Sequence, residues 1–320
     1  LIFYNRYNLM NRKRLFLIDA YALIFRGYYA FIKNPRINSK GLDTSAILGF
    51  TNSLFDVIKR ENPDYLAVCF DKGGSQDRLE IFSEYKANRD ETPEAIKIAV
   101  PFIEQILKAL NIPVVVKKGY EADDIIGTLS KKAEQEGYQT FMVTPDKDFA
   151  QLVSENIFMY KPMFGGGYEV WGVEEVKNKF EVTDPIQVID FLGMKGDSAD
   201  NIPGLPGVGD KTAKKFIAEY GSMEGLLANT DKLKGKLKEK IETNKELGLL
   251  SKKLATIILD VPVDFSPNEF KFKVKDLLEV KDVFRELEFR RLIESVDRIF
   301  NINKDDKELE IKSESTKQTP

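Results

Sequence analysis

Short hydrophobic segments that end at an acidic residue recur along this chain, and they restrict its possible folds more than any other feature. Arg14–Asp19 and Tyr65–Asp71 each close on an aspartate, and Gln139–Asp146 reaches one just after a proline. Another apolar run, Pro113–Val116, is followed by the acidic residues 121–124. Hydrophobic runs of this length are typical of buried strands. The sequence therefore predicts four strands whose acids gather near their carboxyl ends.

Segments with helical periodicity lie between these strands. They cover Ser45–Arg60, Pro93–Leu110 and Ala122–Glu136. Strands that alternate with helices of this length indicate βαβ units and a parallel sheet. We therefore expect an α/β core whose ligands lie beyond the carboxyl ends of the strands.

The pattern changes in the second half of the chain. A glycine triplet, Gly165–Gly167, precedes Tyr168–Trp171 and predicts a hairpin. Short helices are expected over Val173–Phe180 and Pro185–Leu192. Helical periodicity resumes at Lys211, and the residues that follow are rich in lysine.

Acidic residues at the predicted sheet edge, together with those of residues 196–201, form the candidate chemical centre. Carboxylates that share one edge repel each other unless cations neutralise them. Mg²⁺ or Mn²⁺ suits such oxygen ligands, and two such ions support phosphodiester hydrolysis without histidine. Taken singly, each acidic pair also fits a solvated helix start or an N-cap. The candidate metal ligands are Asp19, Asp71, Glu121, Asp123, Asp124, Asp146, Asp148, Asp197 and Asp200.

Composition excludes most other kinds of catalytic site. The 320 residues include no histidine and one cysteine, Cys69, which excludes Ser-His-Asp and Cys-His triads, histidine-ligated zinc and a disulfide framework. The charges nearly balance, with a net charge of −3. No apolar stretch approaches the roughly 18 residues of a membrane span. Leu1–Arg14 lacks the apolar core of a signal peptide. We therefore expect a cytoplasmic protein that does not bind membranes.

The glycine-rich segment Gly204–Ala213 is a candidate for nucleic-acid binding. Its glycine spacing is that of a P-loop, but Asp210 stands where the phosphate-binding lysine is needed. It fits a helix–turn–helix element in which glycines leave backbone N–H groups open to a phosphate. An ordinary glycine turn is the alternative, and the lysines that follow argue against it. The candidate nucleic-acid-binding residues are Gly204, Gly207, Gly209, Lys211 and Thr212.

Basic and aromatic side chains are mixed over residues 78–89. In the functional interpretation, Arg78, Lys86 and Arg89 grip a scissile phosphate and Tyr85 stacks on a base. Charge nearly balances across this region, so a solvated helix is the competing interpretation.

Taken in order, these motifs resemble the 5′-nuclease domain of bacterial DNA polymerase I, a member of the flap endonuclease superfamily. The resemblance implies a PIN-like parallel-sheet core with a helical arch, and a C-terminal helix–three-turn–helix DNA-binding region. It also implies two-metal hydrolysis of DNA near the 5′ end of flapped or nicked duplexes, as in primer removal during replication and repair. It covers about residues 14–300 and rests on Leu17–Asp19, Phe70–Asp71, Tyr85–Arg89, Gly119–Asp124, Thr144–Asp148 and Gly196–Ala213.

The resemblance assigns roles to the charged candidates. The residues that match the family's first metal cluster are Asp19, Asp71, Glu121 and Asp123. Those that match the second are Asp146, Asp148, Asp197 and Asp200, with Asp124 adjoining. The basic residues that match those around the scissile phosphate and the arch are Arg26, Arg78, Lys86 and Arg89. The resemblance also suggests a K⁺ ion at the helix–three-turn–helix.

One departure from the family pattern stands out. Relatives usually carry Arg-His-Glu where this chain has Arg78-Leu79-Glu80, which puts an arch contact at position 79 in doubt but not the metal chemistry.

The domain layout expected from the resemblance has four parts. They are an N-terminal extension (1–13), the nuclease core (14–192, with the arch at about 72–97), the DNA-binding region (193–302) and a polar linker (303–320). Met10 is a candidate natural start, with residues 1–9 extra. We expect a monomer whose partners are branched duplex DNA with a 5′ flap or end and, in the full-length protein, polymerase domains.

Two other classes compete with a 5′-nuclease. A PIN-like protein that holds DNA without cleaving it would lack some of the carboxylates, whereas the set is intact here. A PIN-type ribonuclease directed at RNA fits the core, but the segment Gly204–Ala213 argues for DNA.

Overall fold

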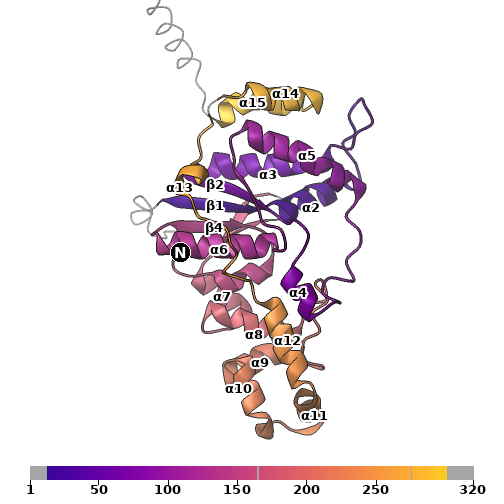
Figure 1. Ribbon diagram of the computed structural model, residues 1–320, viewed down its shortest axis with the longest axis vertical. Coiled ribbons are helices and arrows are strands. Elements are labelled where there is room, and N and C mark those ends of the chain that lie inside the picture. The colour runs from indigo at the N-terminus through magenta and orange to yellow at the C-terminus, as the bar shows by residue number, and fades with distance from the viewer. Residues whose placement is uncertain (1–12, 164–165, 275, 301–320) are drawn as a thin grey trace, which may run out of the picture. The chain divides into compact units, whose positions relative to one another are not determined.

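The computed structural model describes residues 13–163, 166–274 and 276–300. The predicted extension before Lys13, Met10 as a start and the tail 303–320 lie outside the described residues. The chain forms two compact units, and neither is continuous in the sequence. The first unit comprises the chain to Ala22, Asp64–Glu91 and Val114–Phe270, and the second comprises Leu23–Pro63, Thr92–Pro113 and the chain from Lys271 (Figure 1).

A six-stranded sheet forms the centre of the first unit, in the order β3-β2-β1-β4-β5-β6. Neighbouring strands run parallel except for β5 and β6, which form an antiparallel hairpin. The predicted parallel sheet and hairpin are therefore confirmed. The strands are β1 (Arg14–Asp19), β2 (Tyr65–Phe70), β3 (Val114–Val116), β4 (Gln139–Val143), β5 (Ile157–Pro162) and β6 (Tyr168–Trp171).

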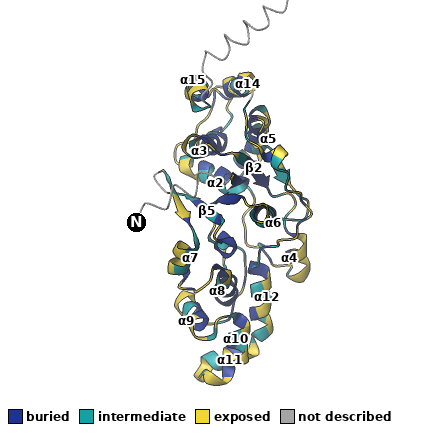
Figure 2. Cartoon of the chain, turned by 90° about the vertical axis from the view of Figure 1, so that its left-hand side faces the viewer, coloured by how far each residue is buried: buried dark blue, intermediate teal, exposed yellow. Residues whose placement is uncertain are grey.

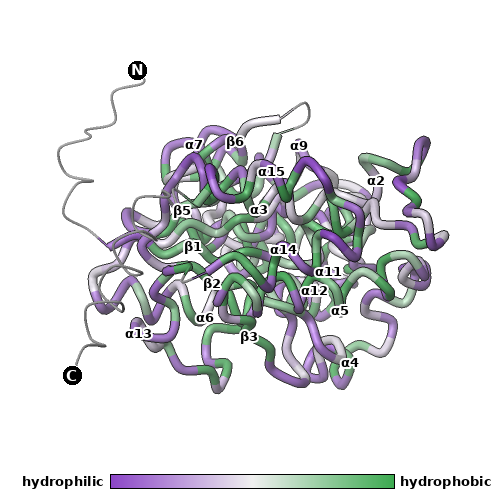
Figure 3. The backbone as a smooth tube through the Cα atoms, turned by 90° about the horizontal axis from the view of Figure 1, so that it is seen from above, coloured by the Kyte–Doolittle hydropathy of each residue, from purple (hydrophilic) through white to green (hydrophobic). Residues whose placement is uncertain are grey.

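The central strands form because nearly all of their residues are hydrophobic and buried. Figure 3 colours the chain by the hydropathy of each residue. Leu15–Ile18 of β1 are fully buried, and in register Ile18 faces Val68 of β2 and Val143 of β4. Burial of each such side chain contributes about 1.5–3 kcal/mol to stability. Because Asp19 directly follows this buried run, the strand fixes its carboxylate at the edge of the sheet.

Helices complete the first unit. The predicted helix after β3 is α6 (Ala122–Gln135), which contacts β1 and β4. Figure 2 shows α6 largely buried and α4 (Gln76–Ile81) largely exposed. The other helices are η1 (Lys147–Leu152), α7 (Val173–Phe180), η2 (Pro185–Gln187), α8 (Val188–Lys195), α9 (Asp210–Tyr220), α10 (Met223–Ala228), η3 (Thr230–Lys232), α11 (Gly235–Thr243), α12 (Lys245–Ala255) and α13 (Pro267–Phe270).

Helices α8 and α12 pack with their backbones in close contact. A Cβ added to Gly193 of α8 would lie 2.6 Å from the Cα of Lys252 on α12. The Lys252 ammonium lies 2.6 Å from the buried Asp190 of α8 and 2.7 Å from Glu224 of α10. These contacts join the helices that carry the glycine-rich turn to the helix that leads back toward the sheet.

The second unit is helical. It holds α3 (Ser45–Glu61), α5 (Glu94–Ala109), α14 (Leu278–Glu286), α15 (Arg290–Ile299) and the greater part of α2 (Ala20–Phe31), which begins in the first unit. Helices α2 and α3 touch at two glycines, since a Cβ added to Gly49 would lie 2.3 Å from the Cα of Gly27. None of the helices in the described ranges is long and apolar enough to cross a membrane.

Candidate active site

Strand β1 ends in Asp19, a buried carboxyl group at the carboxyl edge of the sheet. Its Oδ1 accepts a hydrogen bond from the Ala22 amide at 3.1 Å, and its Oδ2 accepts one from the Thr144 hydroxyl at 3.0 Å. Burial, together with the nearby carboxylate of Asp71, raises the pKa of Asp19 to about 7. Asp19 is therefore held rigidly in a place that disfavours its negative charge when no cation is bound.

Asp71 directly follows β2 and joins that strand to α6. Its Oδ1 accepts a hydrogen bond from the amide of Ala122, the first residue of α6, at 2.5 Å. Burial raises the pKa of Asp71, although this hydrogen bond acts in the opposite direction. The ends of β1 and β2 thus bring two crowded carboxyl groups together at the edge of the sheet.

The acids at the start of α6 have different surroundings. Glu121 is the N-cap, and its amide donates a hydrogen bond to Oδ2 of Asp124 at 3.2 Å in a capping box. Burial and the nearby charges of Asp146 and Asp19 raise the pKa of Asp123 well above its ordinary value. Asp123 therefore belongs to the acidic group, whereas Asp124 has other partners, described below.

Asp146 and Asp148 begin η1 after β4. The side chain of Asp146 accepts a hydrogen bond from the Asp148 amide at 3.0 Å and so caps the helix. Burial and the charge of Asp146 raise the pKa of Asp148 to about 8. Oδ1 of Asp148 is buried and has no hydrogen-bond partner among the described residues. This oxygen is free to bind a cation.

The loop after α8 brings Asp197 and Asp200 to the same region. Nζ of Lys147 lies 2.5 Å from Oδ2 of Asp197. Burial opposes ionisation of Asp197, but Lys147 and the Ala199 amide outweigh it and lower its pKa. Asp200 is paired with Arg89 at 2.5 Å and lies 3.5 Å from Nζ of Lys86.

Lys86 and Tyr85 point into the acidic group. Nζ of Lys86 lies 2.6 Å from Oε1 of Glu121, and the Tyr85 hydroxyl donates to Oε2 of Glu121 at 3.0 Å. Burial lowers the pKa of Lys86, but the carboxylates of Glu121 and Asp200 have the larger effect, so the pKa of Lys86 is raised overall. The Tyr85 ring is buried and therefore offers no face on which a base could stack.

Residues 84–89 are fastened to the loop 197–202 by backbone contacts as well. The Lys86 amide donates to the Asp200 carbonyl at 3.0 Å, with Lys86 in the left-handed region at φ 57°. The amide groups of Asn88 and Asn201 each donate at 2.6 Å, to the carbonyls of Ser198 and Glu84 respectively. The predicted arch segment is thus anchored at one end on the loop that carries Asp200.

Arg78 is buried rather than open to a substrate, with 5% of its surface exposed. Its Nη1 and Nη2 donate to the two carboxylate oxygens of Asp124 at 2.9 and 2.8 Å, and Nη1 also donates to Glu121 at 3.1 Å. Asp124 is fully buried, and both of its oxygens are engaged. These two predicted site residues are therefore partners of each other.

The donor set fits hard divalent cations. The predicted ligands supply carboxylate oxygens alone, which suits Mg²⁺ or Mn²⁺. The raised pKa values of Asp19 and Asp148 show that their charged forms are disfavoured, and Oδ1 of Asp148 has no hydrogen-bond partner among the described residues. A bound cation would favour the charged forms. Within the described ranges, no three acidic side chains already stand close enough together to hold a metal ion. Lys86, Arg89 and Lys147 instead occupy positions beside the carboxylates.

The glycine-rich turn separates into a packed part and an exposed part. Gly204 has φ 67°, its amide donates to Ser251 at 2.9 Å, and an added Cβ would lie 2.5 Å from the Gly196 nitrogen. Gly207 and Gly209 are exposed, as is Lys211 at the start of α9. Thr212 follows on the first turn of the same helix. The exposed part is available to a ligand, whereas Gly204 serves close backbone packing.

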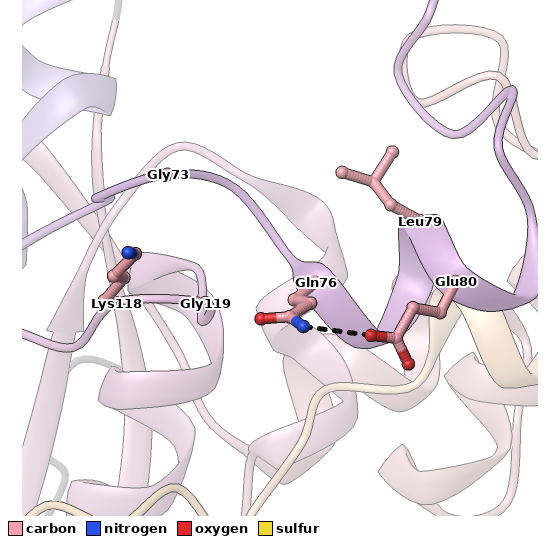
Figure 4. Close-up of a pocket in the computed structure, with 6 residues that line it drawn as sticks. All are labelled: Gly73, Gln76, Leu79, Glu80, Lys118 and Gly119. Carbon is pink, nitrogen blue, oxygen red and sulfur yellow. Dashed lines mark hydrogen bonds between the residues drawn. The ribbon is translucent and has the colours of Figure 1, made fainter.

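Leu79 lines a shallow pocket of about 300 Å³ at the base of the predicted arch. Figure 4 shows its side chain pointing away from Gln76 and Glu80, which are joined by a hydrogen bond of 2.9 Å. Lys118 and two glycines, Gly73 and Gly119, complete the pocket.

Arg26 lies on α2 in the second compact unit, so its role at the scissile phosphate stays a prediction. Sequence reasoning missed two residues that hold the acids in place, Thr144 and Lys147. Their position within the run from Thr144 to Asp148 is the signal that could have identified them.

Comparison with known proteins gives the family. The 5'-3' exonuclease N-terminal resolvase-like domain matches residues 14–181, and the 5'-3' exonuclease C-terminal SAM fold matches residues 183–277. A 5'-3' exonuclease of Aquifex aeolicus is 39% identical over 288 residues, which cover 90% of this chain and 96% of that protein. The chain belongs to the 5'-3' exonuclease family. The resemblance found in the sequence is thereby confirmed.

The same family includes parts of longer proteins. DNA polymerase I of Bacillus caldotenax is 39% identical over 289 residues, which cover 89% of this chain and 32% of that protein. This chain therefore spans about a third of the length of that relative. A crystal structure of the bacteriophage T5 D15 flap endonuclease in complex with DNA and metal ions shares the fold, with TM-score 0.61 and 21% identity over 91% of this chain and 99% of that one.

Proposed function

We propose that this chain is a divalent-metal-dependent 5′-nuclease that hydrolyses phosphodiesters near the 5′ end of flapped or nicked duplex DNA. The observation that carries the proposal is the gathering of acids at one sheet edge, with Lys86 and Arg89 among them. These acids lie at the ends of β1 and β2, at the starts of α6 and η1, and in the loop after α8. The family supports nuclease activity, and a family member, the Aquifex aeolicus protein, is named a 5'-3' exonuclease.

Two groups of carboxylates would hold two Mg²⁺ or Mn²⁺ ions. Bound there, the ions supply activation of the attacking water and stabilisation of the leaving oxygen. We leave Asp124 out of the ligand set because both its oxygens are engaged. The first group is Asp19, Asp71, Glu121 and Asp123, and the second is Asp146, Asp148, Asp197 and Asp200.

Lys86 and Arg89 are the candidates for binding the scissile phosphate. In the structure each is paired with a carboxylate, at 2.6 Å to Glu121 and 2.5 Å to Asp200. A phosphate that enters the site offers them a second anionic partner, which becomes more negative as the bond breaks. Tyr85 orients Glu121 through its hydroxyl, at 3.0 Å.

The exposed turn and the start of α9 form the proposed grip on the duplex. Gly207 and Gly209 expose the backbone there, and Lys211 and Thr212 lie in the first turn of α9. Backbone amides at a helix N-terminus suit phosphate oxygens and read no sequence. The K⁺ ion suggested by the resemblance belongs to the same turn in this proposal. Lys240, whose Nζ would lie 3.6 Å from a Cβ on Gly207, adds a cation that the sequence did not reveal.

The partners follow from the same proposal. Branched duplex DNA is the substrate, and polymerase domains are partners in relatives of the DNA polymerase I type. We propose that the chain acts as a monomer in the bacterial cytoplasm, on the DNA of the nucleoid.

A substrate panel tests the function. A 5′-labelled flap duplex, a nicked duplex, the single strand and an RNA copy of the flap should be incubated with the protein and Mg²⁺. We expect cleavage near the branch of the flap and at the nick, and little cleavage of the single strand or RNA. Equal cleavage of RNA, or binding of the flap without cleavage, would contradict the proposal.

A further inference from the structure

The segment Leu254–Ile258 consists of the last two residues of α12 and the first three of the connection to α13, and its contacts lead to both carboxylate groups. Its backbone is bonded to three buried side chains that come from three different elements. Arg78 of α4 donates through Nε to the Leu254 carbonyl at 3.0 Å and through Nη2 to the Thr256 carbonyl at 2.9 Å. Asp124 of α6 accepts from the Ile258 amide at 2.9 Å.

Gln151 of η1 completes the set. Its Nε2 donates to the Ala255 carbonyl at 2.9 Å, and its Oε1 accepts from the Ile257 amide at 2.9 Å. The same Nε2 lies 3.0 Å from the backbone carbonyl of Asp148, so Gln151 also fixes the residue that carries the partnerless oxygen. Only 4% of Gln151 is exposed. Every residue from 254 to 258 is thus bonded to one of the three side chains.

Arg78 and Asp124 connect this segment to the other carboxylate group. Arg78 donates to Glu121 at 3.1 Å, and Asp124 accepts from the Glu121 amide at 3.2 Å. Arg78 is also the one buried residue of α4, whose other residues are exposed (Figure 2). The helix at the base of the arch is therefore held to the unit through this arginine.

We propose that Gln151, Arg78 and Asp124 are positioning residues that act through the backbone of Leu254–Ile258 to hold Glu121 and Asp148 in place. This inference rests on the proposed nuclease function. In this inference Arg78 and Asp124 bind each other and the backbone of the segment. Arg78 then does not bind the scissile phosphate, and Asp124 does not bind a metal ion. This inference also links the helices 188–255, which carry the proposed DNA grip, to both carboxylate groups through the end of α12.

Two variants with a matched control test the proposal. Gln151→Met keeps the size of the side chain but removes its three hydrogen bonds. Arg78→Lys keeps the charge but loses the fork that reaches Asp124 and two carbonyls at once. Gln139→Met is the control, because Gln139 is another buried glutamine whose Oε1 has no partner in the described structure. All measurements should be made well below each variant's unfolding midpoint, so that a lost positioning contact is distinguished from unfolding.

The readouts are Mn²⁺ affinity by electron paramagnetic resonance, the single-turnover rate on a 5′-flap duplex at saturating enzyme, and the affinity for that duplex across a salt series. For Gln151→Met and Arg78→Lys we expect weaker Mn²⁺ binding and a rate lower by about 10- to 100-fold. Duplex affinity should stay within about twofold with an unchanged salt slope, since neither residue touches DNA in this proposal. Gln139→Met should match the wild type in all three.

Three results would overturn the inference. The first is unchanged Mn²⁺ affinity and rate in both variants. The second is a duplex affinity in Arg78→Lys that falls as much as the rate does, because it would place the Arg78 guanidinium on the DNA. The third is a Gln139→Met variant as impaired as Gln151→Met. Wild-type protein that binds Mn²⁺ but cleaves no flap would refute the proposed function instead, and the Mn²⁺ titrations would still test the positioning role.

Discussion

The ammonium group of Lys86 lies 2.6 Å from Oε1 of Glu121 and 3.5 Å from Asp200, so it stands beside two proposed metal ligands from different groups. The φ angle of 57° and the bond from the Lys86 amide to the Asp200 carbonyl hold the backbone there. The Lys86 ammonium therefore pairs with carboxylates that the proposed function assigns to metal binding.

Replacing Lys86 with methionine should separate metal binding from catalysis. Removal of a positive charge beside Glu121 and Asp200 should tighten Mn²⁺ binding, whereas the single-turnover rate should fall by about 100-fold because a phosphate contact is lost. Calorimetric Mn²⁺ titration and quenched-flow cleavage measure the two effects. Lys177→Met is the control, since Lys177 pairs with Glu174 on the surface of α7. Weaker Mn²⁺ binding or an unchanged rate would show that Lys86 has another role.

Stability without divalent ions should fall as pH rises. Asp19 and Asp148 have an ordinary pKa of 3.8, raised in the folded protein to about 7 and about 8. The folded state then binds protons more tightly than the unfolded chain, so the free energy of unfolding decreases through this window. We expect the melting temperature in EDTA to fall between about pH 5 and pH 8. Added Mg²⁺ should restore it at pH 8, because it binds the folded state.

Asp148→Asn supplies the control for that pH series. The amide does not titrate, so the melting temperature in EDTA should fall less steeply with pH than in the wild type. A wild-type melting temperature that stays constant or rises with pH in EDTA would mean that these acids are not crowded as described.

The two glycines Gly204 and Gly209 should respond differently to alanine. Gly204 has φ 67°, and an added Cβ would lie 2.5 Å from the Gly196 nitrogen, whereas a Cβ on Gly209 meets nothing within 4 Å. Gly204→Ala should therefore destabilise the protein by about 1–3 kcal/mol. Gly209→Ala should leave the melting temperature nearly unchanged. Chemical denaturation of both variants tests this, and equal loss of stability would contradict the packing described.

Lys211 and Lys214 lie on the same helix and should contribute unequally to DNA binding. Lys214 is paired with Glu181 at 3.0 Å and with Asp210 at 3.5 Å, whereas Lys211 is exposed at the first turn. Lys211→Ala should lower the slope of log affinity against log salt by about 0.9, the value for one lost phosphate contact. Lys214→Ala should change it less. Fluorescence anisotropy across a salt series on two unrelated duplexes measures both slopes, and the reverse order would place the DNA elsewhere.

The sequence predicts the sheet and the acids at its edge because both depend on local pattern. A buried run such as Leu15–Ile18 marks a strand, and the residue after it must lie at the end of that strand. Helix α2 is not predicted in the same way, because Ala20–Phe31 is hydrophobic along most of its length, and such a run does not by itself distinguish a helix from a strand. The division of these acids into two metal-binding groups comes from the family resemblance, because the hydrophobic pattern of the sequence does not determine it.

The partners of individual side chains lie beyond sequence reasoning when they are distant in the chain. Arg78 and Asp124 are 46 residues apart, and Gln151 and Ile257 are 106 apart. A single sequence contains no signal for either contact, so Arg78 looks like a phosphate ligand and Gln151 like an ordinary helix residue. Only the fold shows that both are buried and bonded to the same segment.

The central claim is that the acids at the sheet edge catalyse phosphodiester hydrolysis with bound divalent ions. Its most direct test is the single-turnover cleavage of a 5′-flap duplex over a Mg²⁺ titration, with wild type and Asp146→Asn, and with flap binding measured in parallel. We predict a wild-type rate that rises to saturation with Mg²⁺ and vanishes in EDTA, and a rate for Asp146→Asn at least about 100-fold lower with flap binding retained. Cleavage that persists in EDTA, or an Asp146→Asn variant as fast as the wild type, would contradict the account.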